Sequence, residues 1–490
     1  MKDPGQRAQP LVLAAFVAIC MLVFLASSAG VLRLGFPLDD AWIHQTYARN
    51  LARLGEWSFV PGQPSAGSTA PLWTLLLTVG YGLRIPHLTW AYALGGAIWL
   101  GLAWSGGRWF ARRNPGMPAG AWAVGLLIAV EWHLGWAAVS GMETLLFSWL
   151  VLLALWAMDD ERAPWLVGGI TAIAVWVRPD ALTLVLPVVV HALAGAEHRP
   201  GPVAKAAAMY AIGVGLVALP YFALNAAAAG TAFPSTLYAK TLEYSELQHD
   251  PYWLRLFAQL RSPLVGVGIV LVPGLVLSAV HGLRSRRTAR LAPLVWAVGY
   301  LVLFALRLPV VYQHGRYAMP VIPIVIVLGV EGLMLWADLG STSPVRRIAS
   351  RVWVITLAVV SAAFVVIGAR AYGQDVAIIE TEMVDTADWI RANTPAGSLI
   401  AAHDIGALGY FGDRPILDLA GLTSAEAIPI LRDEPALEAW LSREGAAYLM
   451  TFPGWYPRLS ARGTSVYASS GSYSPGAGGE NMAVYAWPPE

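Results

Sequence analysis

The chain is built largely from long apolar runs, and these limit its fold more than any other feature. Runs near the ~20 residues that a membrane-spanning helix needs recur along residues 1–370. Hydrophobic residues make up 57% of the 490 residues and charged residues only 13%, against about 25% charged in a typical soluble domain. The sequence therefore predicts a polytopic α-helical membrane protein. About eleven spans are predicted, at about 11–32, 88–107, 119–138, 143–158, 164–177, 180–196, 204–227, 263–283, 291–308, 318–337 and 352–370.

The arginines between the spans predict the orientation of the chain. With a cytoplasmic N-terminus, the loops that contain Arg112 and Arg346 face the cytoplasm, where positively charged loops are enriched. The first outer loop, at about 33–87, is then long, and we expect interfacial helices at 42–54 and 71–83 within it. These features predict a multi-pass protein of the inner (plasma) membrane whose active site and C-terminal domain are extracytoplasmic.

Residues 371–490 differ in composition from the transmembrane module at 1–370. Short apolar pieces alternate there with helical patterns, and residues 398–402 have the β-branched and apolar character of a strand. We therefore expect a small extracytoplasmic α/β domain. Residues 463–479 are rich in Ser and Gly, so we expect a loop there.

Composition and missing motifs exclude several classes of function. The net charge of +1 gives no reason to expect nucleic acid, which needs a clustered basic face. Cys20 is the single cysteine, so the chain has neither a disulfide framework nor a thiolate metal site. The sequence also lacks a Walker A loop, a Gly-x-Gly-x-x-Gly turn, a His-Glu-x-x-His helix and a Gly-x-Ser-x-Gly elbow, which argues against a nucleotide-driven or protease-type mechanism.

Two adjacent carboxylates, Asp39 and Asp40, follow the first span. A charge near hydrocarbon is tolerated mainly beside a polar cavity or a partner, so we interpret this stretch as the floor of an active site. A carboxylate there can accept the proton of an attacking sugar hydroxyl, or the pair can help to hold a divalent cation. The alternative is that one of them caps the helix that contains Trp42, and both roles are compatible.

Further polar clusters interrupt the apolar sequence, and all fall on the predicted outer side. Arg178, Lys240 and Arg316 can stabilise a phosphate leaving group, because Arg binds two phosphate oxygens at once; the alternative is snorkelling to lipid headgroups or pairing with nearby carboxylates. His44 and Glu143 either line the site or make local polar contacts. The candidate substrate-binding residues are His44, Glu143, Arg178, Asp180, Tyr238, Lys240, His314, Arg316 and Tyr317.

These motifs resemble those of a known family. The stretch Asp39-Asp40-Ala41-Trp42-Ile43 is similar to the first periplasmic loop of GT-C glycosyltransferases that use polyprenyl-phosphate sugars, most nearly in their terminal arabinofuranosyltransferase branch. The resemblance continues through Gly67–Trp73, Ser140–Thr144, Arg178–Asp180, Pro234–Lys240, Arg316-Tyr317 and Asp404–Phe411.

The resemblance implies a GT-C fold and transfer of a pentose or hexose from a polyprenyl-phosphate donor to an extracytoplasmic glycan or lipid acceptor, with inversion. By the same resemblance, Asp39 is the catalytic base, with Asp40 beside it. In some members of the family such residues bind a divalent metal, which leaves Mg or Mn open as a cofactor at Asp39 and Asp40. The alternatives are a protein acceptor, as in mannosyltransferases of the same superfamily, and a sugar transporter or lipid flippase.

Overall fold

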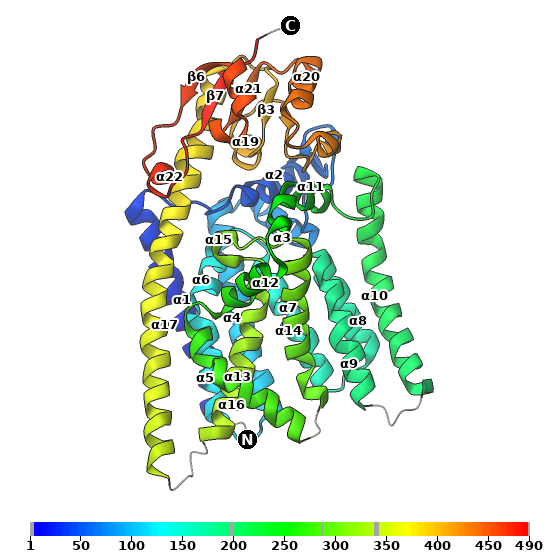
Figure 1. Ribbon diagram of the computed structural model, residues 1–490, viewed down its shortest axis with the longest axis vertical. Helices are drawn as coiled ribbons and strands as arrows, with labels where there is room; N and C mark the ends of the chain where they lie inside the picture. The colour runs from blue at the N-terminus through cyan, green and yellow to red at the C-terminus, as the bar shows by residue number, and fades with distance from the viewer. Residues whose placement is uncertain (1–3, 196–199, 286–287, 338–342, 489–490) are drawn as a thin grey trace.

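The computed structural model describes residues 4–195, 200–285, 288–337 and 343–488. Helices form a long bundle, and the C-terminal part of the chain forms a compact unit at one end of it, opposite the N-terminus (Figure 1). The bundle consists of α1 (Pro4–Val31), α4 (His87–Arg113), α5 (Pro118–Val130), α6 (Trp132–Val139), α7 (Thr144–Asp159), α8 (Pro164–Val175), α9 (Val185–Gly195), α10 (Pro200–Ala229), α13 (Val267–Arg284), α14 (Ala292–Arg307), α16 (Ile322–Ala337) and α17 (Pro344–Ile379).

Every predicted apolar run falls on helical segments of this bundle, although Ala196, at the end of one run, lies outside the described residues. Six described helices are long and apolar enough to cross a membrane, or seven if α5 and α6, which meet at a 50° bend, form one span. Helix α8 has only 12 residues, about 18 Å of helix against a hydrocarbon core of about 30 Å. The count of eleven spans therefore stays a prediction.

The segment between α1 and α4 contains α2 (Asp39–Leu54), a short ribbon of β1 (Ser58–Val60) and β2 (Gln63–Pro64), and α3 (Pro71–Gly82). Helix α2 ends at Gly55, whose φ of 73° is left-handed, a conformation that glycine adopts without strain. Most of α2 is buried. It packs against α3 and against α19 of the terminal domain, and the interfacial position expected for residues 42–54 stays a prediction.

Shorter helices complete the end of the bundle near the terminal domain (Figure 1). They are α11 (Ser235–Glu243), α12 (Tyr252–Arg261) and α15 (Tyr312–Gly315), with short helical segments at Pro179–Leu184, Ser245–His249, Ser262–Leu264 and Met319–Val321. A further turn, Thr288–Leu291, directly precedes α14 at the other end of the bundle.

Helix α17 connects the bundle to the terminal domain. It continues to Ile379, past the boundary predicted after residue 370, and then passes through a π-helical segment, Glu380–Val384, into α18 (Asp385–Asn393). Gly and Pro are absent from residues 374–384, so nothing in the local sequence ends the helix where its apolar stretch ends.

The terminal domain is built on one five-stranded sheet. Its strands are β3 (Ile400–Ala402), β4 (Ile416–Asp418), β5 (Tyr448–Thr451), β6 (Thr464–Ala468) and β7 (Ala483–Ala486), in the order β4-β3-β5-β7-β6. Strand β3 is parallel to β4 and β5, whereas β7 is antiparallel to β5 and β6. The helices are α19 (Gly406–Phe411), α20 (Glu434–Glu444), α21 (Pro457–Arg462) and α22 (Tyr473–Gly476), with turns at Ala425–Ile430 and Pro453–Trp455.

One prediction for this domain is wrong. Residues 463–479 contain β6 and α22 instead of a continuous loop. Strand β6 lies at the edge of the sheet and is mostly exposed. It is short and stands within the Ser- and Gly-rich stretch, and backbone hydrogen bonds to β7 define it.

The terminal domain meets the bundle through α19, which directly follows β3 and packs along α2. The carboxyl end of a central parallel strand thus points at the helix that carries the acidic pair.

Candidate functional site

The two carboxylates of the acidic pair are held in different ways, although both lie in the first turn of α2. Asp40 Oδ2 accepts hydrogen bonds from Lys240 Nζ at 2.9 Å and from Arg316 Nη2 at 2.6 Å. Asp39 instead accepts hydrogen bonds from two backbone amides of the terminal domain, Gly406 N at 2.6 Å and Ala407 N at 2.7 Å. The side chains of successive helical residues point about 100° apart. Asp40 therefore faces two cations, whereas Asp39 faces the backbone of the terminal domain.

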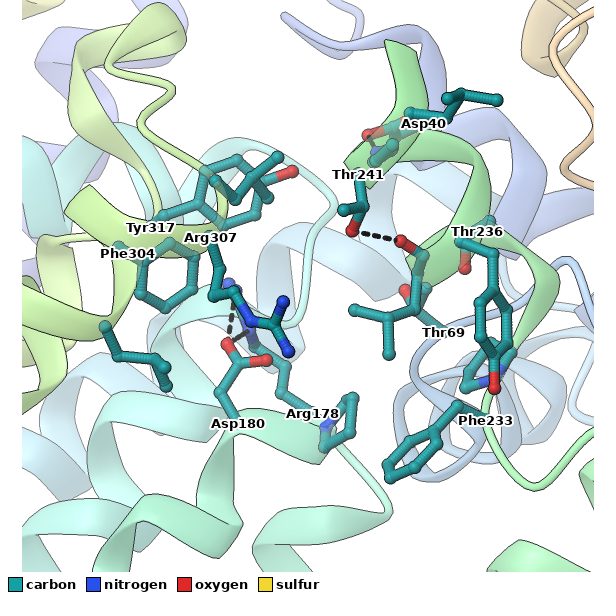
Figure 2. A pocket seen from close by; sticks show the side chains of 18 of the residues that line it. Asp40, Thr69, Arg178, Asp180, Phe233, Thr236, Thr241, Phe304, Arg307 and Tyr317 are labelled. Carbon is teal, nitrogen blue, oxygen red and sulfur yellow. Dashed lines mark hydrogen bonds and ion pairs between the residues drawn. The ribbon is translucent and has the colours of Figure 1, made fainter. Parts of the chain in front are cut away.

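A cavity of about 840 Å³ opens beside Asp40. Figure 2 shows Arg178, Asp180 and Tyr317 on one wall, with Phe233 and Thr236 across from them. The lining residues include eight of the eleven site residues predicted from sequence, namely Asp40, Glu143, Arg178, Asp180, Tyr238, Lys240, Arg316 and Tyr317. Segments separated by nearly 280 residues of sequence therefore meet at one cavity.

Arg316 has unused hydrogen-bonding capacity at this cavity. Its side chain is buried, at 6% exposed, yet Nε and Nη1 have no hydrogen-bond partner among the described residues. Only Nη2 is engaged, by Asp40 Oδ2 and by the hydroxyl of Tyr317 at 3.2 Å. A buried guanidinium with two unpaired N–H groups is costly, and an anion is the partner that offsets this cost best. Both atoms are covered by neighbouring protein atoms in this structure, so an anion reaches them only when those neighbours move.

The cations beside Asp40 also control its protonation. Burial alone would raise the pKa of this carboxyl, but Lys240 and Arg316 hold its pKa well below the usual range. Asp40 is therefore ionised at neutral pH, and its affinity for a proton depends on how strongly the two cations bind it.

Arg178 is held in the cavity wall by two carboxylates and two aromatic rings. Its Nε and Nη2 donate to Asp180 Oδ2 at 2.9 and 2.6 Å, and its guanidinium carbon lies 5.4 Å from the ring centre of Phe147 and 5.0 Å from that of Tyr317. Its Nη1 also lies 3.9 Å from Glu143 Oε1. Since two carboxylates offset its charge, Arg178 contributes shape and rigidity more than free positive potential.

Three predicted site residues lie outside the lining of the cavity. Asp39 is bound to the terminal domain, as described above. His44 lies behind Glu143, with Nε2 3.6 Å from Glu143 Oε2 and Nδ1 3.2 Å from Ser68 Oγ. His314 turns away toward α17, where its Nε2 lies 2.8 Å from Asp375 Oδ2. His44 and His314 are therefore not among the residues that line this cavity, and direct contact of either with substrate stays a prediction.

The terminal domain also contacts the helix that carries Lys240. His403, directly after β3, places Nε2 3.1 Å from Glu243 Oε1 at the end of α11, and its Nδ1 lies 2.8 Å from the hydroxyl of Tyr456. Burial would lower the pKa of His403, but Glu243 raises it above the usual range.

The terminal domain also affects Asp39. Burial and the neighbouring Asp404 raise the pKa of Asp39 to about 7.

Sequence reasoning missed several lining residues. Arg307, at the end of α14, lines the cavity and carried the same signal as Arg178, a cation at the end of an apolar run. Phe233 and Gln248 lie in connecting segments, and Ile428 comes from the terminal domain. No local pattern marks these three, because only the tertiary fold brings them to the cavity.

The residues present do not fit a divalent-cation site at the acidic pair. Asp39 is occupied by amide donors and Asp40 by two cations, so the two carboxylates do not converge on one point. Within the described ranges, no group of three or more His, Cys, Asp or Glu residues could hold a metal ion.

Comparisons with known proteins bear on the fold. A family model described only as a domain of unknown function, DUF8728, matches residues 372–485. No curated protein sequence matches the chain. ArnT from Cupriavidus metallidurans bound to undecaprenyl phosphate matches at a TM-score of 0.61 and 17% identity, over 97% of this chain and 99% of ArnT.

Two other solved structures are similar. The Archaeoglobus fulgidus oligosaccharyltransferase AglB, in complex with an inhibitory peptide and a dolichol-phosphate, matches at a TM-score of 0.61 and 11% identity, over 92% of this chain and 70% of AglB. The arabinofuranosyltransferase AftD from Mycobacteria matches at a TM-score of 0.48 and 16% identity, over 97% of this chain and 41% of AftD, so the predicted nearness to that branch stays a prediction. The chain therefore has the fold of the GT-C membrane glycosyltransferases.

Proposed function

We propose that the protein is a membrane glycosyltransferase that moves a sugar from a polyprenyl-phosphate donor to a hydroxyl of an extracytoplasmic glycan or lipid. The observation that carries this proposal is the unpaired edge of Arg316, buried beside Lys240 at a cavity of about 840 Å³. A phosphate diester is an anion that needs such a site, and the charge on its leaving oxygen grows during transfer. The ArnT and AglB structures were solved with undecaprenyl phosphate and dolichol-phosphate respectively, which supports the same class of donor here.

The composition of the cavity suits a lipid-linked ligand. Besides its charged residues, the lining includes the apolar side chains of Phe233, Leu237, Leu303, Phe304 and Leu308. An isoprenoid chain would extend along these side chains while its phosphate remains at Arg316 and Lys240. Contacts of the phosphate with charged residues and of the isoprenoid chain with apolar residues would orient the donor before reaction.

We assign the proton-accepting role to Asp40. Asp40 lines the cavity, whereas Asp39 is engaged by two amides of the terminal domain. The acceptor oxygen forms a bond to the anomeric carbon, the bond from that carbon to the phosphate oxygen breaks, and the hydroxyl proton passes to the Asp40 carboxylate. A bound phosphate shares Arg316 and Lys240 with Asp40, which loosens their hold and raises the proton affinity of Asp40 when the base is needed.

We further propose that the cavity and the terminal domain are extracytoplasmic, in the plasma membrane. Helix α17 begins near Arg346 and Arg347, at the end of the bundle away from the terminal domain (Figure 1). The basic loops are expected on the cytoplasmic side, which leaves the cavity on the outer side.

The test is transfer of a radiolabelled sugar by the purified full chain, with a panel of undecaprenyl-phosphate-linked pentoses and hexoses as donors and lipid, glycan and peptide acceptors. The proposal expects labelled product and release of undecaprenyl phosphate, with Asp40→Asn strongly impaired and Asp388→Asn, at an exposed helical ion pair, unchanged. Labelled peptide would favour the protein-directed alternative. Movement of intact donor across proteoliposomes without chemical change would favour the flippase and overturn the proposal.

A further inference from the structure

A left-handed turn directly precedes Arg316. Gln313, His314 and Gly315 have φ values of 55°, 57° and 66°, so three consecutive residues occupy the left-handed region. Residues with a Cβ atom adopt this region only at a cost in free energy, and such conformations persist where the surroundings determine them, often at functional sites. The structure should therefore contain contacts that hold this turn.

His314 makes those contacts with α17. Its Nε2 lies 2.8 Å from Asp375 Oδ2, and Trp136 Nε1 donates to the same oxygen at 2.9 Å. The imidazole also lies edge-to-face with the rings of Trp132 and Trp136, with centroids 5.4 and 5.5 Å away. One side chain of the turn is thus fixed by a carboxylate and two indoles.

Close packing restricts the turn at its next residue as well. A Cβ atom on Gly315 would lie 1.6 Å from Ser262 Oγ and 2.9 Å from Ser262 Cβ, so another residue there would displace Ser262 and would also bear the cost of the left-handed φ. The backbone then enters a right-handed helical turn at Arg316, and the guanidinium reaches Asp40 with Nη2 at 2.6 Å. The path of the turn therefore decides where Arg316 enters the cavity.

We propose that His314 is a positioning residue, which binds Asp375 of α17 and so holds the left-handed turn that presents Arg316 to the cavity. The proposal deepens the proposed function and rests on it where Arg316 is taken as the phosphate ligand. Since α17 also leads into the terminal domain, this contact ties Arg316 to the helix that carries that domain.

The variants separate the hydrogen bond from the backbone conformation. Asp375→Asn keeps a carbonyl oxygen for His314 and Trp136, whereas Asp375→Leu is similar in size and offers no acceptor. His314→Gly permits the left-handed turn without the contact to α17. Gln313→Gly is the matched control, because Gln313 is exposed and glycine removes the conformational cost while leaving the His314 contact in place.

Two readouts on the purified full chain complete the test, namely the Kd for undecaprenyl phosphate and the rate at which phenylglyoxal modifies Arg316 without lipid, followed by mass spectrometry. We expect Asp375→Leu and His314→Gly to weaken binding about tenfold or more, the effect of one misplaced charged hydrogen bond, and to speed modification of Arg316. Asp375→Asn should stay within about twofold of wild type, and Gln313→Gly should bind normally.

Unchanged binding and unchanged Arg316 reactivity in both Asp375→Leu and His314→Gly would overturn the positioning role. Equal losses in Asp375→Asn and Asp375→Leu would also overturn it, because the acceptor oxygen would then be irrelevant. If wild type fails to bind undecaprenyl phosphate, the proposed function fails, while the Arg316 reactivity still decides whether His314 positions that side chain.

Discussion

Replacing Asp40 by Asn should separate donor binding from turnover. Asn is nearly the same size and keeps one oxygen that accepts from Lys240 or Arg316, so the cavity should keep its shape. The substitution removes a negative charge that shares these two cations with the donor phosphate. It also removes the group to which we assign the acceptor proton. We therefore expect tighter donor binding together with slower reaction.

The size of the binding effect follows from the geometry at Arg316. Asp40 occupies Nη2, and the free edge at Nε and Nη1 lies across the same guanidinium. Two unit negative charges about 6 Å apart, at an effective dielectric constant of about 20, repel each other by about 3 kcal/mol. Relief of this repulsion corresponds to binding that is about 100-fold tighter. Loss of a general base should lower kcat by about 10²–10⁴-fold.

Both quantities can be measured on the purified full chain, as the Kd for undecaprenyl phosphate and as kcat with saturating donor. Asp388→Asn serves as the control, since Asp388 pairs with Arg391 on the exposed surface of α18. Weaker or unchanged binding by Asp40→Asn would refute the idea that Asp40 competes with the phosphate for the cations. Unchanged kcat would remove the base assignment even if the binding changed as expected.

Three further predictions concern the cations and the terminal domain. Arg316→Lys should weaken binding of undecaprenyl phosphate by about 10–100-fold, because an ammonium group cannot replace the two free N–H groups of the guanidinium. Gly406→Ala should destabilise docking of the terminal domain by about 1–3 kcal/mol, because its Cβ atom would lie 2.0 Å from the carbonyl oxygen of Asp39. The measurement is the rate at which a protease releases the terminal domain, which should rise. Gly397→Ala is the control and should behave as wild type, because a Cβ atom there meets nothing within 4 Å. The contact of His403 with α11 should be fully present below about pH 6.5 and lost as pH rises through the raised pKa of His403, so the melting temperature of wild type should fall over that range more than that of His403→Gln.

Much of the fold could be predicted because apolar length is a local property of sequence. Each predicted apolar run falls on a helical segment, and the strand at 398–402 is present as β3. The number of spans could not be settled in the same way, because α8 and its neighbours are short and partly covered by other helices. The burial of α2 and the formation of strand β6 both depend on contacts with other segments of the chain. The periodicity of apolar residues within a segment does not reveal such contacts.

The candidate site was predictable where a polar residue interrupts apolar sequence, as at Arg178, Lys240 and Arg316. It was not predictable where the deciding contact is a backbone group or a distant carboxylate. Asp375 lies late in a long helix, and nothing local indicates that His314 will reach it. Conversely, a polar residue close to the acidic pair in sequence does not have to face the cavity, since the side chain of His44 lies beside Glu143 and outside the cavity lining.

The two carboxylates of the acidic pair are adjacent in sequence but make different contacts. The side chains of Asp39 and Asp40 leave α2 in different directions, so Asp40 meets the cations while Asp39 accepts hydrogen bonds from the amides at the start of α19. Further along α2, Arg49 donates to the carbonyl oxygen of Tyr410 near the end of α19 at 2.6 Å. Helix α2 therefore contacts both ends of α19. The carboxylate of Asp39 binds the amides at its N-terminal end, and the guanidinium of Arg49 binds a carbonyl oxygen at its C-terminal end. The terminal domain thus contacts α2, which carries Asp40, and through His403 and Glu243 it also contacts α11, which carries Lys240.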